Sequence, residues 1–499
     1  MAPRPGASIT DQDHQTLHSI YGGNEPLMDD GGEQHANKST ILQHSHASYL
    51  GFPTTATYCL ILNLLIEIFD MILLTPQIAL FQRSICFQHY QQEGARVPGQ
   101  GCQAKVIQQE LAIVRGWKGF FDCIPVLLMA IPTGYLADRI GRRKVMAMIL
   151  SGMLAGAAWY ILICSFPAVF PVRLLWLSSV FYLSGGGYWS ASIMVLAIAA
   201  DACSEADRSR IFYYLYSVYL FTELVAPSIA SVTMDNNLML PFLIGIIALL
   251  LCFPVLYVMP ETLKSLDTIT QVEPVEPDES TYLRESYSET AVDHPVENGL
   301  WWILRCRNTL LVVPIFFVTT FRATTLSVLL QYTAVRFSWK LSSTNALLSV
   351  VAGVNLLLVL FFLPGLTSLL QHRYKISSPK IDLSVARVSL LVLAIGSFLV
   401  GLAPTAAFMI PSLVIFAFGY GARVSTFSVL SSWVNKEHSA RVYGIVAVIE
   451  NLGVLAGEPT LQNVFAATLD FSGVWRGTPF FCTACLYAIA AAFSWSIRL

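Results

Sequence analysis

Residues 238–258 read LMLPFLIGIIALLLCFPVLYV, a stretch of 21 residues without a charged side chain. An α-helix of about 20 apolar residues is long enough to cross the roughly 30 Å hydrocarbon core of a lipid bilayer. The stretch is therefore predicted to be a membrane-spanning helix. A similar apolar run over residues 387–406 predicts a second one.

The composition of the whole chain agrees with a membrane protein. Of its 499 residues, 55% are hydrophobic and 12% are charged, whereas about 25% of the residues of a soluble domain are charged. This composition argues strongly against a soluble globular protein. The net charge of −2 and the lack of a separate Lys/Arg cluster argue against a nucleic-acid partner. The lipid bilayer is the expected environment.

Apolar runs and the breaks between them predict about twelve spans. We expect an all-α, polytopic membrane protein with transmembrane helices arranged as two six-helix pseudo-repeats. The predicted spans cover residues 55–81, 117–136, 144–166, 172–199, 211–233 and 239–259 in the first half, and 309–333, 343–365, 386–404, 408–432, 441–463 and 478–497 in the second.

Two polar segments lie before and after the first six spans. Residues 1–53 carry five of the nine histidines and show no signal peptide, so a solvated cytoplasmic tail without a metal site is expected. Residues 260–308 contain ten acidic residues, which predicts an acidic cytoplasmic linker. The six-helix halves are then predicted over residues 54–259 and 309–499.

The distribution of Lys and Arg predicts the orientation of the spans. Basic residues such as Arg142 collect in the loops after even-numbered spans, and cytoplasmic loops retain positive charge during insertion. Both termini are therefore expected in the cytoplasm, where the only glycosylation sequon, residues 37–39, is not used. Cys86 and Cys102 share one polar loop on the other side, where they either form a disulfide or remain free thiols.

Two short matches indicate an internal duplication of six helices. GGG at residues 185–187 corresponds to GYG at 419–421, and FD at 69–70 corresponds to FR at 321–322. Small residues let helix backbones approach closely, so the glycine segments indicate either tight packing or a bend in a moving helix. Trp189 is a candidate for stacking on an organic substrate, or else it fills space between helices.

Ionisable side chains inside spans are costly in a bilayer and are therefore functional candidates. Spans three, six, nine and twelve carry none in their interiors, which predicts that they face lipid while the others surround a polar cavity. Asp122, near the outer end of its span, is expected to pair with Arg115 or Lys118. The predicted lining of the cavity, together with Trp189, is Glu67, Asp70, Glu223, Arg322, Arg423 and Glu450.

The acids and arginines of this set come from opposite halves. Glu67 and Asp70 are three residues apart and share a face of the first span. Arg322 and Arg423 lie near the middle of two spans of the second half, so we expect Asp70 to face Arg322. The alternative is that these residues form structural ion pairs or packing contacts. A carboxylate near an arginine also offers a route for proton coupling, with Asp70 and Glu67 as first candidates.

The loop after the second span reads GYLADRIGRRK over residues 134–144. It resembles the loop motif of the major facilitator superfamily, G-x-x-x-D-[RK]-x-G-[RK]-[RK], and matches every fixed position. Residues 260–263, PETL, resemble the ending of the first half in that family, whereas the loop after the eighth span lacks the motif. The resemblance implies a conformational latch on the cytoplasmic side, formed by Gly134, Asp138, Arg139, Gly141, Arg142 and Arg143.

The acidic central loop, the long polar tail and residues 441–480 are similar to fungal multidrug or secondary-metabolite exporters. The resemblance implies a secondary active transporter that exports a small organic molecule, coupled to protons, by alternating access. We expect a monomer in the plasma membrane rather than in a vacuolar or other internal membrane. Two alternatives are a proton-coupled importer of a nutrient or organic anion, and a non-transporting sensor of the same fold.

Other classes of membrane protein fit the sequence less well. The phosphate-binding pattern G-x-x-x-x-G-K-[ST] of ATP-driven pumps does not occur in the chain. All nine histidines fall outside the predicted spans, so haem or metal ligands at membrane depth are not expected. The chain is therefore predicted not to be an enzyme and to need no cofactor.

Overall fold

The structure is a computed structural model that describes residues 54–94, 101–203, 205–261, 307–433 and 439–497. The predicted tail, residues 1–53, with its sequon and its histidines, lies outside the described residues, as does most of the predicted linker, residues 262–306. No residue of the described part belongs to a β-strand. The predicted all-α class is confirmed.

Twelve helical segments of the described chain are long and apolar enough to cross a membrane, which confirms the predicted spans. The first half contains α1 (Thr54–Gln92), α2 (Lys105–Ile140), α3 (Arg142–Ser165), the 3₁₀ helix η2 (Val172–Ser184) with α4 (Gly187–Ala202), α5 (Glu205–Asn236) and α6 (Leu240–Val258). The second half contains α9 (Arg307–Thr319) with α10 (Phe321–Arg336), α11 (Leu341–Leu357) with η4 (Leu358–Phe362) and α12 (Leu363–Tyr374), α13 (Ser378–Leu402), α14 (Ala406–Phe418) with α15 (Gly421–Trp433), α16 (Ser439–Thr468) and α17 (Thr478–Trp495). Two short 3₁₀ helices, η1 (Gly101–Gln103) and η6 (Gly473–Gly477), precede α2 and α17.

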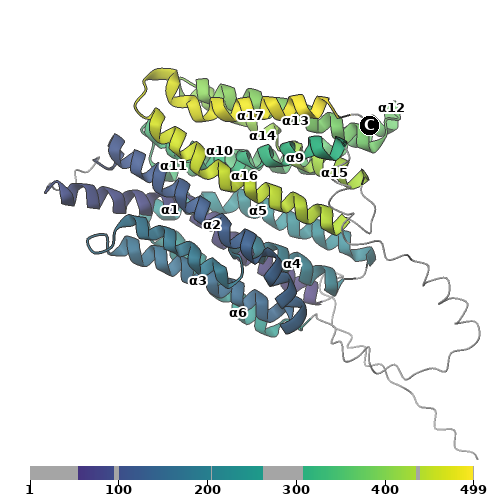
Figure 1. Cartoon of the computed structure of the whole chain (residues 1–499), viewed down its shortest axis with the longest axis horizontal. Coiled ribbons are helices and arrows are strands. Elements are labelled where there is room, and N and C mark those ends of the chain that lie inside the picture. The colour runs from purple at the N-terminus through teal and green to yellow at the C-terminus, as the bar shows by residue number, and fades with distance from the viewer. Residues whose placement is uncertain (1–53, 95–100, 204, 262–306, 434–438, 498–499) are drawn as a thin grey trace, which may run out of the picture. The chain divides into compact units, whose positions relative to one another are not determined.

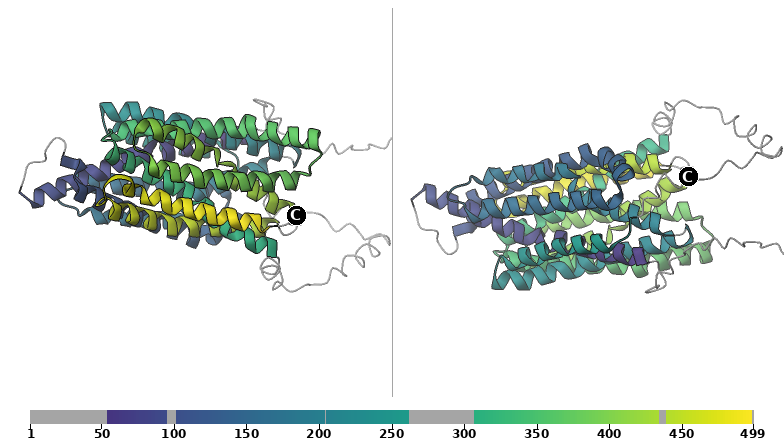
Figure 2. Two further views of the ribbon diagram at one scale, coloured as in Figure 1. Left: turned by 90° about the horizontal axis from the view of Figure 1, so that it is seen from above. Right: turned by 90° about the horizontal axis from the view of Figure 1, so that it is seen from below.

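Successive spans run in opposite directions, so alternate connections gather at each end of the bundle. We call the end where α1 stops at Gln92 and α2 begins the disulfide end. The end where α2 turns into α3 at Gly141 is the loop end. Figure 1 shows the first half in purple to teal and the second in green to yellow, with α2 and α16 side by side. Figure 2 shows the same helices from two opposite sides.

The first two helices are longer than the predicted spans. α1 continues to Gln92 instead of ending near residue 81, and α2 starts at Lys105 instead of near residue 117. Hydropathy marks only the part of a helix that meets lipid, whereas the helix itself continues as long as its backbone hydrogen bonds are made. Most of the predicted polar loop between these spans is therefore helical.

Spans four and ten break at the two glycine segments that match in sequence. Span four changes from η2 to α4 at Gly185 and Gly186, and Gly186 has a φ of +92°, which a side chain disfavours. Span ten breaks between α14 and α15. A Cβ on Gly185 would collide with Ile149 of α3, and one on Gly419 would collide with Leu393 of α13. The breaks pack on spans three and nine in the same way, which agrees with two pseudo-repeats.

A further glycine sets the spacing of spans nine and ten. A Cβ on Gly396 of α13 would lie 2.5 Å from the backbone nitrogen and the Cα atom of Phe416 in α14. These backbone atoms cannot move away unless α14 itself shifts. Because lipid tails are as apolar as helix side chains, helices in a bilayer associate through close packing of this kind.

Replacing Gly396 with alanine is therefore expected to lower the free energy of unfolding by about 1–3 kcal/mol, the usual cost of an extra methylene in a packed contact. The measurement is the thermal unfolding midpoint of the purified protein in detergent. Gly365→Ala in α12 is the matched control, because no atom lies within 4 Å of its Cβ position. Equal midpoints for the two variants would show that the α13–α14 contact is not tight.

Candidate functional site

A chain of hydrogen bonds joins the two halves through Arg322, the second residue of α10. The Nη2 atom of Arg322 donates to Oδ1 of Asn355 at 2.9 Å, and Nδ2 of Asn355 donates to Oε1 of Glu223 at 3.3 Å. Asn355 belongs to α11 and is fully buried, and Glu223 belongs to α5 of the first half. One amide side chain thus separates a cation of the second half from an acid of the first.

Aromatic rings surround the Arg322 side of this chain. The guanidinium carbon of Arg322 lies 4.8 Å from the ring centre of Tyr420 and 5.8 Å from that of Phe416. A guanidinium over a ring face is attracted by the negative charge of that face. The hydroxyl groups of Tyr420 and Tyr216 are 2.5 Å apart, and the ring of Tyr216 stacks on Tyr219 at 6.0 Å. These tyrosines continue the contact between the halves beside Arg322.

Two polar atoms of the chain lack hydrogen-bond partners within the described structure. They are Nε of Arg322 and Oε2 of Glu223, and both are buried. Leaving a buried donor or acceptor unpaired costs about 1–3 kcal/mol, and more for a charged group. A proton or a polar ligand group that bonded to these two atoms would therefore be stabilised more than at atoms that already have hydrogen-bond partners.

Glu67 and Asp70 lie within the first half. Oε2 of Glu67 accepts a hydrogen bond from the Tyr188 hydroxyl at 2.8 Å, and Glu67 also interacts electrostatically with Asp70 and Glu223. Asp70 interacts electrostatically with Tyr160 and Tyr188, which belong to the same half. The expected pairing of Asp70 with Arg322 does not occur. α5 lies between α1 and α11, so Glu223 takes the place next to Arg322 through Asn355.

Arg423 and Glu450, both predicted cavity residues, form a bidentate ion pair between α15 and α16. The two nitrogen–oxygen distances are 2.5 and 2.9 Å. The side chain of Arg423 is 56% exposed although it lies near the middle of its span. A charged group exposed to hydrocarbon is very unfavourable, and the ion pair with Glu450 lowers that cost. Trp189 is 53% exposed and packs edge-to-face on Tyr188 at 5.5 Å.

Asp122 is held by Lys118, one of its two predicted partners. Nζ of Lys118 lies 2.5 Å from Oδ2 of Asp122, and Ser179 of η2 donates to Oδ1 at 2.5 Å. The other predicted partner, Arg115, instead donates to Ser327 and Gln331 of α10. Asp122 thus has a structural role in the first half, while Arg115 reaches across to the second.

The loop motif at residues 134–144 contacts the first half. Nε of Arg142 pairs with Asp201 at the end of α4 at 2.8 Å, and its backbone N–H donates to Glu261 at 3.1 Å. Gly141 has a φ of +99°, and a Cβ there would meet the Glu261 carboxylate at 2.6 Å. Arg143 donates to the carbonyl oxygen of Tyr257 at 3.0 Å. Arg139 lies over the ring of Tyr135, and Asp138 is exposed.

At the disulfide end the two halves are in close contact. A Cβ on Gly116 would lie 2.9 Å from Cβ of Gln462, and one on Gly119 would lie 2.8 Å from Cγ of Glu458, so α2 and α16 touch there. Lys105, the first residue of α2, also forms an ion pair with Asp470, which follows the end of α16. α5 and α11 are also in contact at this end, bonded through Asp235 and Ser342, Ser231 and the Ser342 carbonyl, and Ser228 and Ser349.

Towards the loop end, one glycine of α2 and one of α16 have no such close neighbours. Gly134 of α2 and Gly444 of α16 lie beyond Gly119 and Glu458 towards the loop end, and no atom outside its own helix backbone comes within 4 Å of the Cβ position of either glycine. The glycine contacts of this helix pair therefore lie at the disulfide end. Gly134, predicted to permit close helix contact, has no such contact in this structure.

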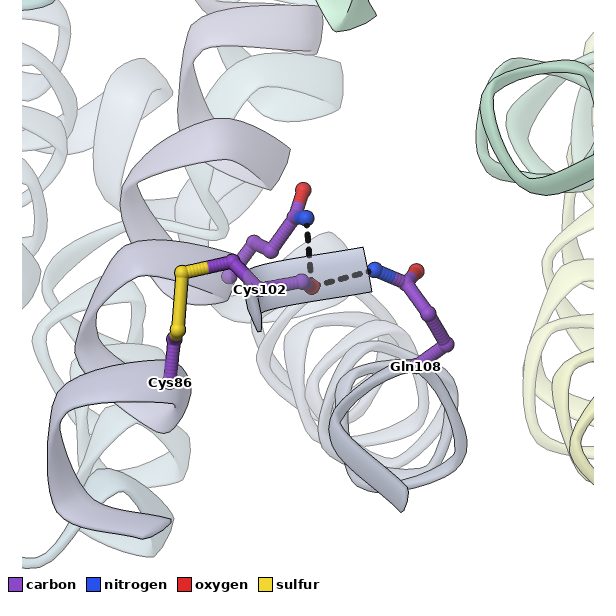
Figure 3. The surroundings of a disulfide bond; sticks show 4 residues. Cys86, Cys102 and Gln108 are labelled. Atoms are coloured by element: carbon purple, nitrogen blue, oxygen red, sulfur yellow. Dashed lines mark hydrogen bonds between the residues drawn. A yellow bond between two sulfur atoms is a disulfide. The ribbon is translucent and has the colours of Figure 1, made fainter. Parts of the chain in front are cut away.

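The disulfide is linked to the contact at its end of the bundle. Cys86 of α1 and Cys102 of η1 are disulfide-bonded, and the Cys102 carbonyl accepts hydrogen bonds from Gln82 at 2.9 Å and Gln108 at 3.0 Å (Figure 3). The carbonyl and Oε1 of Gln108 in turn accept from Nε2 of Gln331 at 2.9 and 3.0 Å. The disulfide thereby anchors the buried side chain of Gln108, which accepts a hydrogen bond from Gln331 of the second half.

No amide side chain was predicted from the sequence as a site residue. Asn355 and Gln331 lie inside predicted spans but carry no charge, so a search for ionisable groups passes over them. A neutral amide buried at membrane depth also needs a partner, and that need was the available signal. The described residues contain no group of three or more His, Cys, Asp or Glu side chains that could hold a metal ion.

The family follows from comparison with known proteins. The family model described as Major Facilitator Superfamily matches residues 116–429, which is more than half of the chain. The chain belongs to the major facilitator superfamily. The matched region includes the loop motif and the Arg322–Asn355–Glu223 chain of this transporter, and the predicted family is confirmed.

Two curated relatives cover nearly the whole chain. The efflux pump ustT of Aspergillus flavus is 28% identical over 96% of this chain and 97% of its own length. The MFS efflux pump atnC of Emericella nidulans is 28% identical over 88% of this chain and 87% of its own length. Both names describe fungal exporters of this superfamily, the group that the sequence resembles.

Solved structures share the fold. A crystal structure of a D-xylose–proton symporter matches with a TM-score of 0.62 at 15% identity and covers 91% of this chain and 98% of its own. The human organic anion transporter MFSD10 matches with a TM-score of 0.53 at 17% identity, covering 88% and 98%. At such identities the likeness shows the twelve-helix fold alone.

Removing the disulfide is expected to weaken the contact at the disulfide end, because Gln108 then loses its anchored acceptor. One hydrogen bond contributes about 1 kcal/mol, so the C86S/C102S variant should populate the separated state roughly fivefold more. The measurement is the labelling rate, by an impermeant maleimide, of a cysteine replacing Ser342, which is 4% exposed. The background lacks Cys482 and Cys485.

The matched control is C123S/C252S, which removes two buried free thiols of the first half and leaves the disulfide intact. Its labelling rate should equal that of the parent. If C86S/C102S labels at the parent rate too, the disulfide does not support the contact between the halves.

Proposed function

We propose that this transporter exports a small organic compound in exchange for protons. The observation that carries the proposal is the Arg322–Asn355–Glu223 chain, which crosses between the halves and keeps an unpaired nitrogen and an unpaired oxygen. The names of the two curated relatives, both efflux pumps, support export over import. We further propose that the exporter acts as a monomer in the plasma membrane.

The loop end is the cytoplasmic end in this proposal. Basic residues of the loop motif, Arg139 to Lys144, gather there, and positive loops remain in the cytoplasm during insertion. The Cys86–Cys102 disulfide lies at the other end, and disulfides persist in oxidising compartments such as the exterior. Both features favour the same orientation, with the two chain termini inside.

The distribution of contacts then corresponds to a cytoplasm-facing state. α2 and α16 touch at the exterior end, at Gly116 and Gly119, whereas the Cβ positions of Gly134 and Gly444, nearer the cytoplasmic end, have no neighbouring atom of another helix within 4 Å. Rocking of one half against the other would reverse this arrangement. Gly134 and Asp138 of the loop motif would meet the second half only in the exterior-facing state, where they would act as the latch.

Glu223 is the proposed site of exchange. Its Oε2 atom has no partner; as part of a carboxylate it accepts a hydrogen bond from a substrate donor, whereas a proton on it turns it into a donor and weakens that bond. A proton on Glu223 also removes its attraction to Arg322 across Asn355. Competition for one oxygen makes proton and substrate alternate, which is the requirement for antiport. Glu67 and Asp70 are the next candidates for a relay, because Glu67 interacts with Glu223.

The test is uptake into inverted vesicles with an acidic interior, using a panel of small organic compounds. We expect uptake that collapses with a protonophore. Glu223→Gln should lose gradient-driven uptake by at least tenfold but retain substrate exchange without a gradient, because the amide still offers an oxygen. Arg322→Ala should lose both, because it leaves Asn355 unpaired and removes the cation.

The control is Glu110→Gln, which removes a carboxylate paired with Arg173 at 3.3 Å on the surface of the disulfide end. Its uptake should match the parent. Gradient-driven uptake by Glu223→Gln at the parent rate would remove Glu223 from coupling. Flux only out of inverted vesicles would make the protein an importer.

A bulky side chain at residue 134 tests the latch. Gly134→Leu should leave the unfolding midpoint unchanged, since no atom lies within 4 Å of the Cβ position. Transport should fall at least tenfold, because leucine would block the approach of α2 to the second half in the exterior-facing state. The measurement pairs uptake with thermal unfolding. Unchanged transport would show that the halves never close tightly at Gly134.

A further inference from the structure

A surface cavity of about 560 Å³ lies at the loop end between the start of α3 and the end of α6. Small-molecule sites usually measure about 300–1,000 Å³. The lining is Arg143, Lys144, Ala147, Phe253, Pro254, Leu256 and Tyr257. The cavity is separate from the Arg322–Asn355–Glu223 chain, which lies between the halves, and it belongs entirely to the first half.

The polar side of the cavity is positive. Arg143 uses one guanidinium nitrogen on the Tyr257 carbonyl at 3.0 Å. Lys144 is exposed and has no bonded or ion-paired partner in the described part of the chain. The nearby acids are engaged by Arg142, Asp201 by its side chain at 2.8 Å and Glu261 by its backbone N–H at 3.1 Å. The charge of Arg143 and Lys144 therefore remains available to a ligand.

The other wall is apolar and belongs to a helix at the membrane surface. Phe253, Pro254 and Leu256 line it, and the side chain of Tyr257 is 80% exposed. Tyrosine is enriched where a span leaves the hydrocarbon core, since its ring is apolar and its hydroxyl group is polar. Two cationic side chains beside an apolar wall suit an anionic lipid better than a soluble anion, because only the lipid has an acyl chain to cover the wall.

We propose that this cavity binds one anionic phospholipid from the leaflet at the loop end, with its phosphate on Arg143 and Lys144 and an acyl chain along Phe253 to Tyr257. The cytoplasmic leaflet holds the anionic lipids of a cell, and basic pockets between spans on that side bind such headgroups. The inference uses the orientation of the proposed function but requires no transport activity.

The site adjoins the loop motif. Arg143 directly follows Arg142, whose contacts with Asp201 and Glu261 hold the turn at Gly141. A phosphate on Arg143 and Lys144 joins the start of α3 to the end of α6 from the outside of the same turn. The bound lipid therefore stabilises the first half at the loop end in either transport state.

The experiment uses the full chain in nanodiscs and measures bound lipid by native mass spectrometry after release into detergent. The discs contain phosphatidylcholine with or without one-fifth phosphatidylserine. Each basic residue contributes roughly fivefold to binding of an anionic lipid, so R143Q/K144Q should retain phosphatidylserine about thirtyfold more weakly. The thermal unfolding midpoint, raised by phosphatidylserine in the parent, should no longer respond.

The matched control is R373Q/K375Q, which removes two exposed basic residues from the end of α12 at the loop end, outside the cavity. It should retain phosphatidylserine like the parent. Equal loss in both variants would mean a general surface-charge effect and would overturn the site. No preference of the parent for phosphatidylserine over phosphatidylcholine would overturn it too. Full displacement of the bound lipid by millimolar inorganic phosphate would show that the cavity is a site for a free anion and not for a lipid.

These outcomes are independent of flux. A protein that shows no transport in the vesicle assay can still bind the lipid, and an active exporter can fail to bind it. Unfolding midpoints of the two variants in phosphatidylcholine alone report whether either substitution damages the fold.

Discussion

Hydrocarbon offers no hydrogen-bond partner to a backbone amide or a charged side chain, and the rest of this structure depends on that constraint. The chain satisfies its backbone by forming helices over all twelve spans. Where helices break, as at Gly185 and Gly419, the break is packed against a neighbouring span and not against lipid. Charged groups at membrane depth are placed where another helix or water can meet them.

Amide side chains carry much of the bonding between the halves. Asn355 separates Arg322 from Glu223, and Gln331 connects Arg115 to Gln108. A direct buried ion pair would hold two halves together strongly, because breaking it leaves an uncompensated charge. The amide makes one hydrogen bond to each charged group, so the cation and the acid are not in direct contact.

The two ends of α2 differ in the packing of their glycines. Gly116 and Gly119 contact α16 closely, whereas Gly134 contacts nothing beyond its own helix backbone. Glycine permits close approach but does not enforce it, because it has no side chain to pack. Glycines of one helix can therefore be closely packed at one position and open at another. The disulfide and the Gln82–Cys102–Gln108 bonds anchor the disulfide end.

The sequence alone determined the features that depend on local chemistry. Apolar length located twelve spans, glycine segments marked places of either tight packing or a bend in spans four and ten, and residues 134–144 indicated the superfamily. It also singled out Cys86 and Cys102 and the ionisable residues at membrane depth. It misjudged the length of α1 and α2, because hydropathy reports contact with lipid and not the extent of a helix.

Only the tertiary structure decided which residues meet. Sequence symmetry suggested Asp70 opposite Arg322, but the acid next to Arg322 is Glu223, and Arg423 pairs with Glu450 within its own half. A side chain's partner depends on the rotation of each helix about its axis and on which helix lies between two others. Those quantities follow from the packing of all twelve spans together, and they cannot be inferred from the sequence of any single span.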